Sequence, residues 1–294
     1  MVTIKQHYYP RCLLKNFSND RNKIYAYIPQ NNIITLQNYE NVCHSNKTYE
    51  SDNVIDNILE NELSSYETKM CSLTNNILSN VFKTNIDSIS INKFLKEKSN
   101  GLKLFNYDFL LSQEDKEFIF KYLLLQYLRT DYGRLNHMLI LEQGSSYAPR
   151  TQPFNKDDII ENKDKLEEFN RLYKKGKNLK NLIDKFNIPE KVDLKIALSP
   201  INLLTSDNPV IFEGGFFQIS MPISPYVTIE FIEKSILGTN NLFAILSNNK
   251  ALYLNKCTIT TSNYYVLSNI PFKKYQQVHL KNKYNHNDLP KSYF

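Results

Sequence analysis

The N-terminal block of the sequence carries side chains that could transfer a proton and hold an anion. In QHYYPRCLLKNF, residues 6–17, His7 and Arg11 stand four residues apart and Asn16 follows. If both face one pocket, the histidine supplies a proton-transfer group and the arginine an anion clamp. The alternative is a strand edge in which Arg11 pairs with a structural carboxylate.

A second polar block, TSDNP at residues 205–209, lies between two apolar strand-like runs. Pro209 biases Asn208 away from helical backbone, so Asp207 and Asn208 are expected in a loop at a strand end. Such loops often carry functional polar groups, and Asp207 could hold a metal ion or act as a base. The alternative is an Asx-turn, in which both side chains only cap the local backbone.

Two acidic residues accompany an apolar stripe. Between residues 59 and 77 the apolar side chains recur at spacings of four and three, which predicts a long helix within residues 52–83. Asp52 is its expected N-cap. Glu60 and Glu67 lie seven residues apart, so both occupy one edge of the stripe, two turns from each other. They are further candidates for a base or a metal ligand.

A buried central helix is predicted from residue 112 to residue 141. Ser112, followed by acidic residues, is typical of a helix start, and residues 118–128 are apolar on nearly every side. Gln126 and Arg129 are neighbours on one face of this helix. Arg129 therefore needs a partner, because an unpaired buried charge costs several kcal/mol or more.

The whole pattern favours an α+β fold in a single domain covering residues 1–294. A mostly antiparallel sheet would be built from both ends of the chain, with a central helical layer packed on it. The expected parts are a β-rich start at 1–50, a helical part at 52–187, a β-rich part at 192–270 and a loosely held polar tail at 273–294. KIYAYI at 23–28 and the following IITLQNY predict a hairpin, and Gly214-Gly215 predicts the turn of another.

Composition favours a soluble cytoplasmic protein. The chain has 294 residues and 41% hydrophobic residues, and none of its apolar runs approaches the roughly 20 residues of a membrane span. No leader-like segment is visible at the N-terminus. The formal net charge of +6 is mild for this length, so it gives only weak support for a nucleic-acid partner.

The four cysteines predict no metal site and no disulfide. Cys12, Cys43, Cys71 and Cys257 are widely spaced and form no CxxC pair, and the adjacent Cys43-His44 is a weak metal signal. Four free thiols in a reducing compartment are therefore expected.

Read in order, several blocks resemble one bacterial family. QHYYPRCLLKNFSND followed by KIYAY is similar to the opening of the domain-of-unknown-function family DUF4238, which reads roughly HYVPRFYLRNF. Further similar blocks follow over about residues 6–268: Tyr49 with Glu50, ILENELSSYE, LLLQYLRT, LTSDNPV, MPISP, LYLN with Asn255, and YYVLS. Tyr9 replaces the usual valine and Cys12 the usual aromatic residue, and neither departure touches the polar positions.

The resemblance implies which residues to follow, since the family carries no agreed catalytic role. Its polar positions in this chain are His7, Arg11, Asn16, Glu60, Glu67, Gln126, Arg129, Asp207 and Asn208. Our hypothesis is that they converge on one cleft. Carboxylates with a histidine suit acid–base work or a hard divalent ion, and two arginines suit a phosphate.

These groups favour a phosphodiester hydrolase, a nuclease acting on RNA or DNA. Asp207 with Glu60 or Glu67 would hold Mg²⁺ or Mn²⁺ or act as base, while His7 would be the general acid or base. Arg11 and Arg129 would neutralise the scissile phosphate. Family context suggests a phage-defence or toxin effector. The sequence has no P-loop, GxGxxG, HExxH or GxSxG motif.

Two other classes of function remain open. A sensor or binding module would use the same groups to hold an anionic small molecule, such as a nucleotide, without turnover. A purely structural role would use the buried arginine–carboxylate pairs to specify the fold. A different hydrolase, or a transferase acting on a nucleotide, is also compatible with the residues. Loss of stability in Asp207→Ala would favour the structural role, and loss of activity with an intact fold would favour an enzyme.

Overall fold

The computed structural model describes residues 5–82, 105–144, 154–213, 218–234 and 242–284. Its main sheet has five strands, which in spatial order are β10 (Phe243–Ile245), β5 (Val192–Leu198), β9 (Val227–Glu233), β8 (Gln218–Ser224) and β7 (Ile211–Glu213). Only the pairing of β10 with β5 is parallel within this sheet. The expected mostly antiparallel α+β architecture is therefore confirmed.

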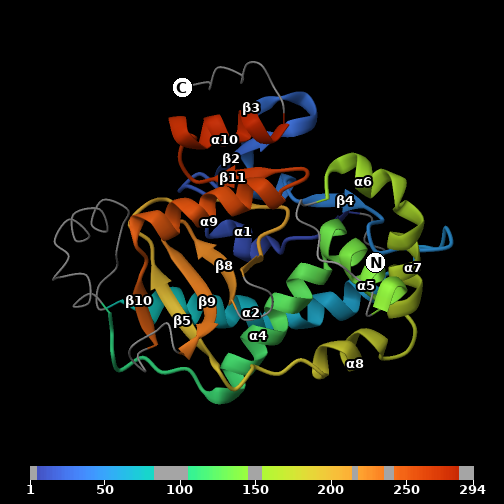
Figure 1. The fold of residues 1–294 in the computed structure, drawn as a ribbon, viewed down its shortest axis with the longest axis horizontal. Coiled ribbons are helices and arrows are strands. Elements are labelled where there is room, and N and C mark those ends of the chain that lie inside the picture. The colour runs from blue at the N-terminus through green and yellow to red at the C-terminus, as the bar shows by residue number, and fades with distance from the viewer. Residues whose placement is uncertain (1–4, 83–104, 145–153, 214–217, 235–241, 285–294) are drawn as a thin grey trace.

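Both faces of the main sheet are covered. Successive side chains of a strand point to opposite faces, and on this sheet each face packs in a different apolar cluster. In β5, Leu194, Ile196 and Leu198 enter the large core, whereas Ala197 enters a second cluster with Ala251 and Leu254. Those last two residues belong to α9 (Asn248–Thr261). The sheet thus lies between α9 on one face and the large core on the other (Figure 1).

Segments from both ends of the chain share a second sheet, as the sequence predicts. Its strands are, in order, β3 (Ile33–Asn38), β2 (Lys23–Ile28), β11 (Val266–Ser268) and β6 (Thr205–Ser206), all antiparallel. The expected hairpin of residues 23–38 is β2–β3. A separate pair joins β1 (Lys5–His7) to β4 (His44–Asn46) and places His7 opposite His44.

The central helical layer is present, with different boundaries. Its helices are α2 (Ile58–Asn80), α4 (Gln113–Leu128), α5 (Asp131–Gln143), α6 (Lys156–Glu161), α7 (Lys163–Tyr173) and α8 (Asn178–Asp184). Ser112 caps α4 as predicted, since its hydroxyl accepts from the N–H of Asp115. Asp52 is not the cap of α2. Asn57 occupies that position, and Asp52 lies earlier, in left-handed backbone.

The single helix predicted over residues 112–141 is broken after Leu128. Thr130 interrupts it, because its side chain caps the next helix by accepting from the N–H of Gly133. A side chain at Gly133 would collide with the backbone of Tyr127, so glycine permits the two helices to approach at the bend. The break turns α5 away from α4 and positions Asp131 and Arg134 at its start.

Besides α1 (Arg11–Lys15), which lies within the expected β-rich start at 1–50, two further helices of the described residues occupy segments that the sequence did not assign as helical. The first is α9, within the expected β-rich part at 192–270, where CTITT gives its end a strand-like composition. The second is α10 (Lys274–Tyr284), within the expected loose tail. Leu280 is fully buried against Tyr27 and Phe272, so packing on the second sheet holds α10. The predicted Gly214-Gly215 turn lies outside the described residues.

The expectation of four free thiols is wrong for two of them. A disulfide joins Cys12 and Cys71, whose Cα atoms are 6.0 Å apart, while Cys43 and Cys257 are free. The pair forms because α1 (Arg11–Lys15) packs on α2, a contact between residues 59 positions apart that no local pattern reveals. Within the described ranges, no helix has the length and apolarity needed to cross a membrane.

Candidate functional site

Arg129 is the centre of the first group of predicted residues. Its guanidinium is buried, forms an ion pair with Glu67 and donates to the backbone carbonyl of His7. The ring of Tyr49 lies beside it, with 5.9 Å between the guanidinium carbon and the ring centroid, and the Tyr49 hydroxyl donates to the Arg129 carbonyl. The expected partner of the buried arginine is therefore Glu67. Arg129 connects the end of α4 to α2 through Glu67 and to β1 through the His7 carbonyl.

Glu60 lies on α2, seven residues before Glu67, and one of its carboxylate oxygens forms no hydrogen bond. Its Oε2 atom is buried and has no hydrogen-bond partner. Burial raises the pKa of Glu60 to about 7, with Glu67 and Glu50 adding to the increase and Arg129 opposing it. A carboxyl group that titrates near neutral pH is suited to proton transfer.

The raised pKa makes stability depend on pH. The folded-state value of about 7 lies above the ordinary 4.5, so the contribution of Glu60 is fully present below pH 4.5 and is lost as the pH rises through 7. Relative to Glu60→Gln, the wild type should lose about 1–3 kcal/mol of unfolding free energy between pH 4.5 and pH 8. Urea unfolding across this range measures it. As a control, Glu161→Gln, at an exposed position, should show the same dependence of unfolding free energy on pH as wild type. If Glu60→Gln also shows the wild-type dependence, the raised pKa of Glu60 is contradicted.

His7 and Gln126 each donate a side-chain hydrogen bond to a backbone carbonyl. The Nε2 atom of His7 donates to the carbonyl of Glu40 at 3.3 Å, and burial lowers the pKa of this histidine to about 4, with Arg11 contributing. The imidazole rings of His7 and His44 lie 5.3 Å apart between centroids. Gln126 is fully buried and donates to the carbonyl of Tyr8 at 2.7 Å, so its amide fastens β1 to α4.

Asp207 forms a second group with Asn208, in the TSDNP loop. Its carboxylate is buried and accepts from three successive backbone N–H groups, those of Asn263, Tyr264 and Tyr265, at 2.9–3.1 Å. Burial raises its pKa to about 6, and the N–H donors oppose that rise. Asp207 therefore anchors the backbone of residues 263–265, which follow α9, and so positions Tyr264 and Tyr265.

Two adjoining cavities lie beside that segment. One has a volume of about 510 Å³ and contains Arg134, Lys47, Lys163 and Asn170 in its lining. The other, of about 250 Å³, is lined by Tyr8, Gln30, His44, Ser45, Asp131, Tyr264 and Tyr265. Ser45, Asp131 and Tyr264 line both cavities, so these residues form the shared wall. Volumes of this order are typical of small-molecule sites.

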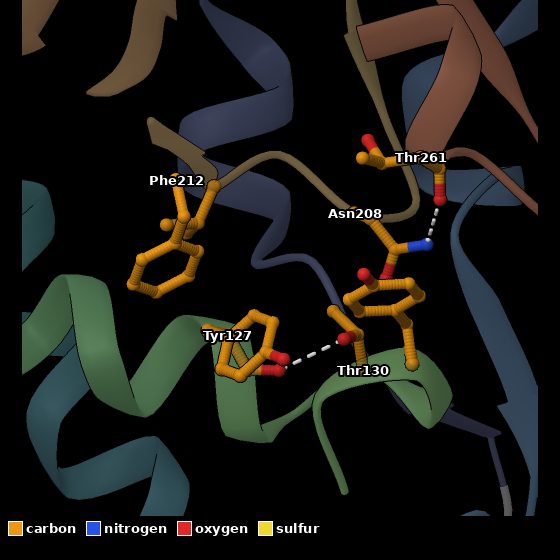
Figure 2. Close-up of a pocket in the computed structure, with 7 residues that line it drawn as sticks. Tyr127, Thr130, Asn208, Phe212 and Thr261 are labelled. Atoms are coloured by element: carbon orange, nitrogen blue, oxygen red, sulfur yellow. Dashed lines mark hydrogen bonds between the residues drawn. The ribbon is translucent and has the colours of Figure 1, made fainter. Parts of the chain in front are cut away.

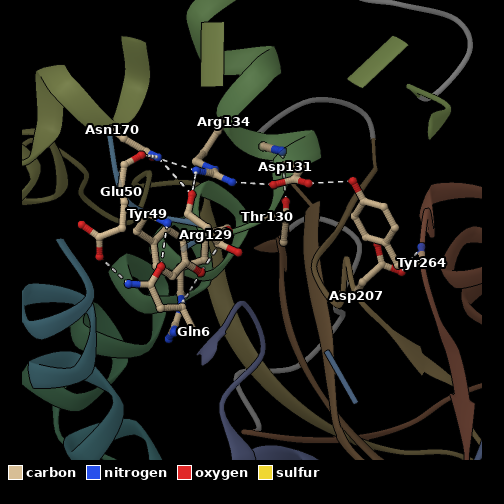
Figure 3. Close-up of polar contacts among 12 residues, drawn as sticks. Gln6, Tyr49, Glu50, Arg129, Thr130, Asp131, Arg134, Asn170, Asp207 and Tyr264 are labelled. Atoms are coloured by element: carbon tan, nitrogen blue, oxygen red, sulfur yellow. Dashed lines mark hydrogen bonds and ion pairs between the residues drawn. The ribbon is translucent and has the colours of Figure 1, made fainter. Parts of the chain in front are cut away.

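A continuous polar network supports the shared wall (Figure 3). Asp131 pairs with the guanidinium of Arg134 through one carboxylate oxygen and accepts from the Tyr264 hydroxyl at 2.7 Å through the other. Arg134 also donates to the Asn170 side chain and the Thr48 carbonyl at 2.7–2.8 Å. Its carbon Cζ lies 5.3 Å from the centre of the Tyr49 ring, so Tyr49 contacts both buried arginines.

The predicted polar positions therefore divide between two places. His7, Arg11, Glu60, Glu67 and Arg129 influence one another around α2 and β1, whereas Asp207 and Asn208 lie at the loop that anchors residues 263–265. Asn16 lies at the C-terminal end of α1, and its buried side-chain amide nitrogen has no hydrogen-bond partner. The link between the two places is Tyr8, which contacts Gln126 through its carbonyl and Tyr264 through its ring.

Sequence reasoning missed the residues of the shared wall. Asp131 and Arg134 stand three positions apart at a helix start, the same kind of signal that selected Gln126 and Arg129, so the spacing could have found them. Tyr264 has no such signal. It lies 133 positions from Asp131 and reaches it only through the tertiary fold.

The described residues do not assemble the expected metal site. Within them, no group of three or more histidine, cysteine, aspartate or glutamate side chains is arranged to hold a metal ion. The oxygens of Asp207 are directed to backbone N–H groups. Acid–base chemistry by histidine or by Glu60 is what the arrangement supports most directly.

Comparison with known proteins identifies a family and nothing closer. No curated protein and no solved structure matches the chain. The family model described as "Protein of unknown function (DUF4238)" matches residues 5–271, which include every predicted polar position and the shared wall of the cavities. The chain belongs to the DUF4238 family.

Proposed function

We propose that the adjoining cavities bind one nucleotide unit, either free or at the end of a nucleic-acid strand. The observation that carries the proposal is the contrast between the two linings. The smaller cavity is rich in aromatic rings, and the larger one contains three cations together with four carboxylates. The two cavities meet at Ser45, Asp131 and Tyr264. A nucleotide has the same division between a flat base and an anionic phosphate.

The smaller cavity suits a base. Tyr8, Tyr264 and Tyr265 offer ring surfaces on which a planar heteroaromatic group can stack, a contact worth about 1–3 kcal/mol per base. Gln30 and Ser45 add hydrogen-bonding groups for the edge of the base. The positions of Tyr264 and Tyr265 are fixed because their backbone N–H groups donate to the Asp207 carboxylate, so this part of the stacking surface is preformed.

The larger cavity suits the phosphate because its acids are already engaged. Glu50 accepts from Gln6 and from Asn57, and Asp52 pairs with Arg171. Glu167 pairs with Lys163 and Asp131 with Arg134, so these two cations of the lining are engaged as well. Lys47 is exposed at the same cavity and adds a cation for an incoming phosphate group. The overall charge of +6 favours approach of an anion.

Blocking the shared wall should abolish nucleotide binding. Ser45 is exposed, so Ser45→Trp fills the junction of the cavities without removing a buried contact. We expect calorimetric titration with AMP, GMP, ATP and GTP to give saturable binding to wild type, at least ten-fold weakened in Ser45→Trp. Lys47→Ala should weaken binding by about two-fold to five-fold, as an exposed charge does.

The matched control is Ser72→Trp, which places the same ring on an exposed position of α2 outside both cavities. It should bind like wild type. Wild-type protein that binds none of the four nucleotides, or Ser45→Trp that binds all of them normally, would refute the proposal.

Hydrolysis of a phosphodiester bond is the reaction that His44 could support. His44 lines the base cavity directly before Ser45, a residue that also lines the phosphate cavity, and its buried Nδ1 atom has no hydrogen-bond partner. Burial, with the nearby Lys5, lowers its pKa, so the ring is neutral near pH 7 and can accept a proton. The proton would come from a water whose oxygen attacks phosphorus, while the bond to the leaving sugar oxygen breaks and solvent protonates it.

A cleavage assay tests this reaction. Labelled single-stranded and duplex RNA and DNA are incubated with the protein in Mg²⁺ or Mn²⁺, and again with EDTA. We expect cleavage that falls by about 10²–10⁴-fold in His44→Ala, the usual contribution of a general base. Loss of cleavage in EDTA would add a divalent ion to the mechanism. If the protein binds nucleotides but cleaves none of these strands, the hydrolase proposal is refuted and the role of a nucleotide sensor remains.

The cellular setting follows from the same proposal. A nuclease or nucleotide sensor acting in the cytoplasm as a phage-defence or toxin effector is consistent with these ligands. Expression in bacteria challenged with phage, with Ser45→Trp as the inactive control, tests that role.

A further inference from the structure

A third cavity lies on the other side of the Thr130 bend and shares no lining residue with the proposed nucleotide site. Its volume is about 70 Å³, and it is lined by Tyr127, Thr130, Tyr132, Asn208, Val210, Phe212 and Thr261. Figure 2 shows the TSDNP loop carrying Asn208 across this cavity from the aromatic rings. The space exceeds the roughly 30 Å³ that one water occupies in the liquid but is smaller than the ~150 Å³ of a benzene-binding cavity.

Asn208 presents one unused polar atom to this cavity. Its Nδ2 atom donates to the carbonyl of Thr261 at 2.6 Å and to Asp207 at 3.2 Å, so the orientation of the amide is fixed. The opposite atom, Oδ1, is buried and has no hydrogen-bond partner, and the residue is only 4% exposed. A buried acceptor without a donor costs about 1–3 kcal/mol, and a ligand with an N–H group would remove that cost.

Aromatic rings form the facing wall. The ring centroids of Tyr127 and Phe212 are 4.8 Å apart in an edge-to-face arrangement, and Tyr132 meets Tyr127 edge to face at 5.9 Å. Faces of such rings attract a cation through their negative quadrupole. The carboxylate of Asp207, which contacts Asn208, adds a negative charge near the cavity, and none of the described residues that line the cavity is basic.

We propose that this cavity binds the ammonium end of an alkylamine. One N–H of the ammonium would donate to Oδ1 of Asn208, and the ammonium with its first methylene groups would contact the rings of Tyr127 and Phe212. The volume admits the ammonium and its first one or two carbons and excludes a ring, so the rest of a longer chain would lie outside the cavity. Free amines and lysine side chains share this chemistry. The inference does not depend on nucleotide binding, because neither cavity of that site shares a residue with this one.

Nuclear magnetic resonance titrations test the proposal on the full chain. The probes are butylammonium chloride, neutral butanol of the same length, and N-acetyl-lysine methylamide. We expect saturable shifts of the Val210 and Thr261 methyl signals with butylammonium at millimolar concentrations, and binding at least ten-fold weaker for butanol. Equal binding of the lysine derivative would identify a peptide side chain as a source, and its exclusion would restrict the site to free amines.

A pair of variants isolates the aromatic wall. Phe212→Tyr retains the ring and should bind butylammonium normally, whereas Phe212→Leu retains apolar volume and should bind between about two-fold and thirty-fold more weakly. The spectra themselves report whether each variant is folded. Absence of shifts with butylammonium, equal affinity for butanol, or unchanged binding in folded Phe212→Leu would each overturn the proposal and leave a hydrated cavity.

Discussion

Asp207→Ala should lower the unfolding free energy by about 3–5 kcal/mol, because three buried or partly buried backbone N–H groups then lose a charged acceptor. For a chain of 294 residues, that corresponds to a fall of roughly 5–8 °C in melting temperature. Chemical unfolding at pH 7.5 measures the effect. The exposed Asp20→Ala, outside any such contact, should change stability by less than about 0.5 kcal/mol.

The same substitution discriminates between the roles considered for the TSDNP loop. A residue that only performs catalysis can be removed with little change in stability, so an unaltered melting temperature with lost activity would contradict our assignment. A positioning role predicts that nucleotide binding weakens together with stability, since Tyr264 and Tyr265 lose their anchor. Asp207→Asn should be intermediate, because its carbonyl oxygen still accepts while its amide nitrogen faces the backbone N–H groups.

Arg129→Met should destabilise the protein by about 3–5 kcal/mol, because it leaves Glu67 and the His7 carbonyl without their buried donor. The double variant Arg129→Met with Glu67→Leu should recover much of that loss, since apolar groups of similar volume often replace a buried ion pair without penalty. Urea unfolding of the two single variants and the double variant gives the coupling energy directly.

Lys121→Met provides the matched control on the same helix. Lys121 is partly exposed and lies 3.9 Å from Asp184, so its loss should cost less than about 1 kcal/mol. If Arg129→Met costs no more than Lys121→Met, the network around Arg129 does not stabilise the fold. If the double variant is as unstable as the sum of the single variants, Arg129 and Glu67 are not coupled.

Much of the scaffold was determined by local patterns. Apolar spacing predicted α2, and Ser112 with the apolar run that follows predicted a helix over α4. Alternation predicted the β2–β3 hairpin. These features depend on side chains within one or two turns of each other, so the sequence carries them directly. The rule that a buried charge needs a partner also predicted that Arg129 would be paired, although it did not name Glu67.

The tertiary structure decided the rest, because those features depend on contacts between distant segments. CTITT favours a strand by composition, yet packing on the main sheet makes it the end of α9. Cys12 and Cys71 become neighbours only when α1 packs on α2. The shared wall requires the Thr130 bend, which presents Asp131, and the Asp207 hydrogen bonds, which hold Tyr264. No periodicity encodes a contact across 133 residues, so the site follows from the fold and not from any single motif.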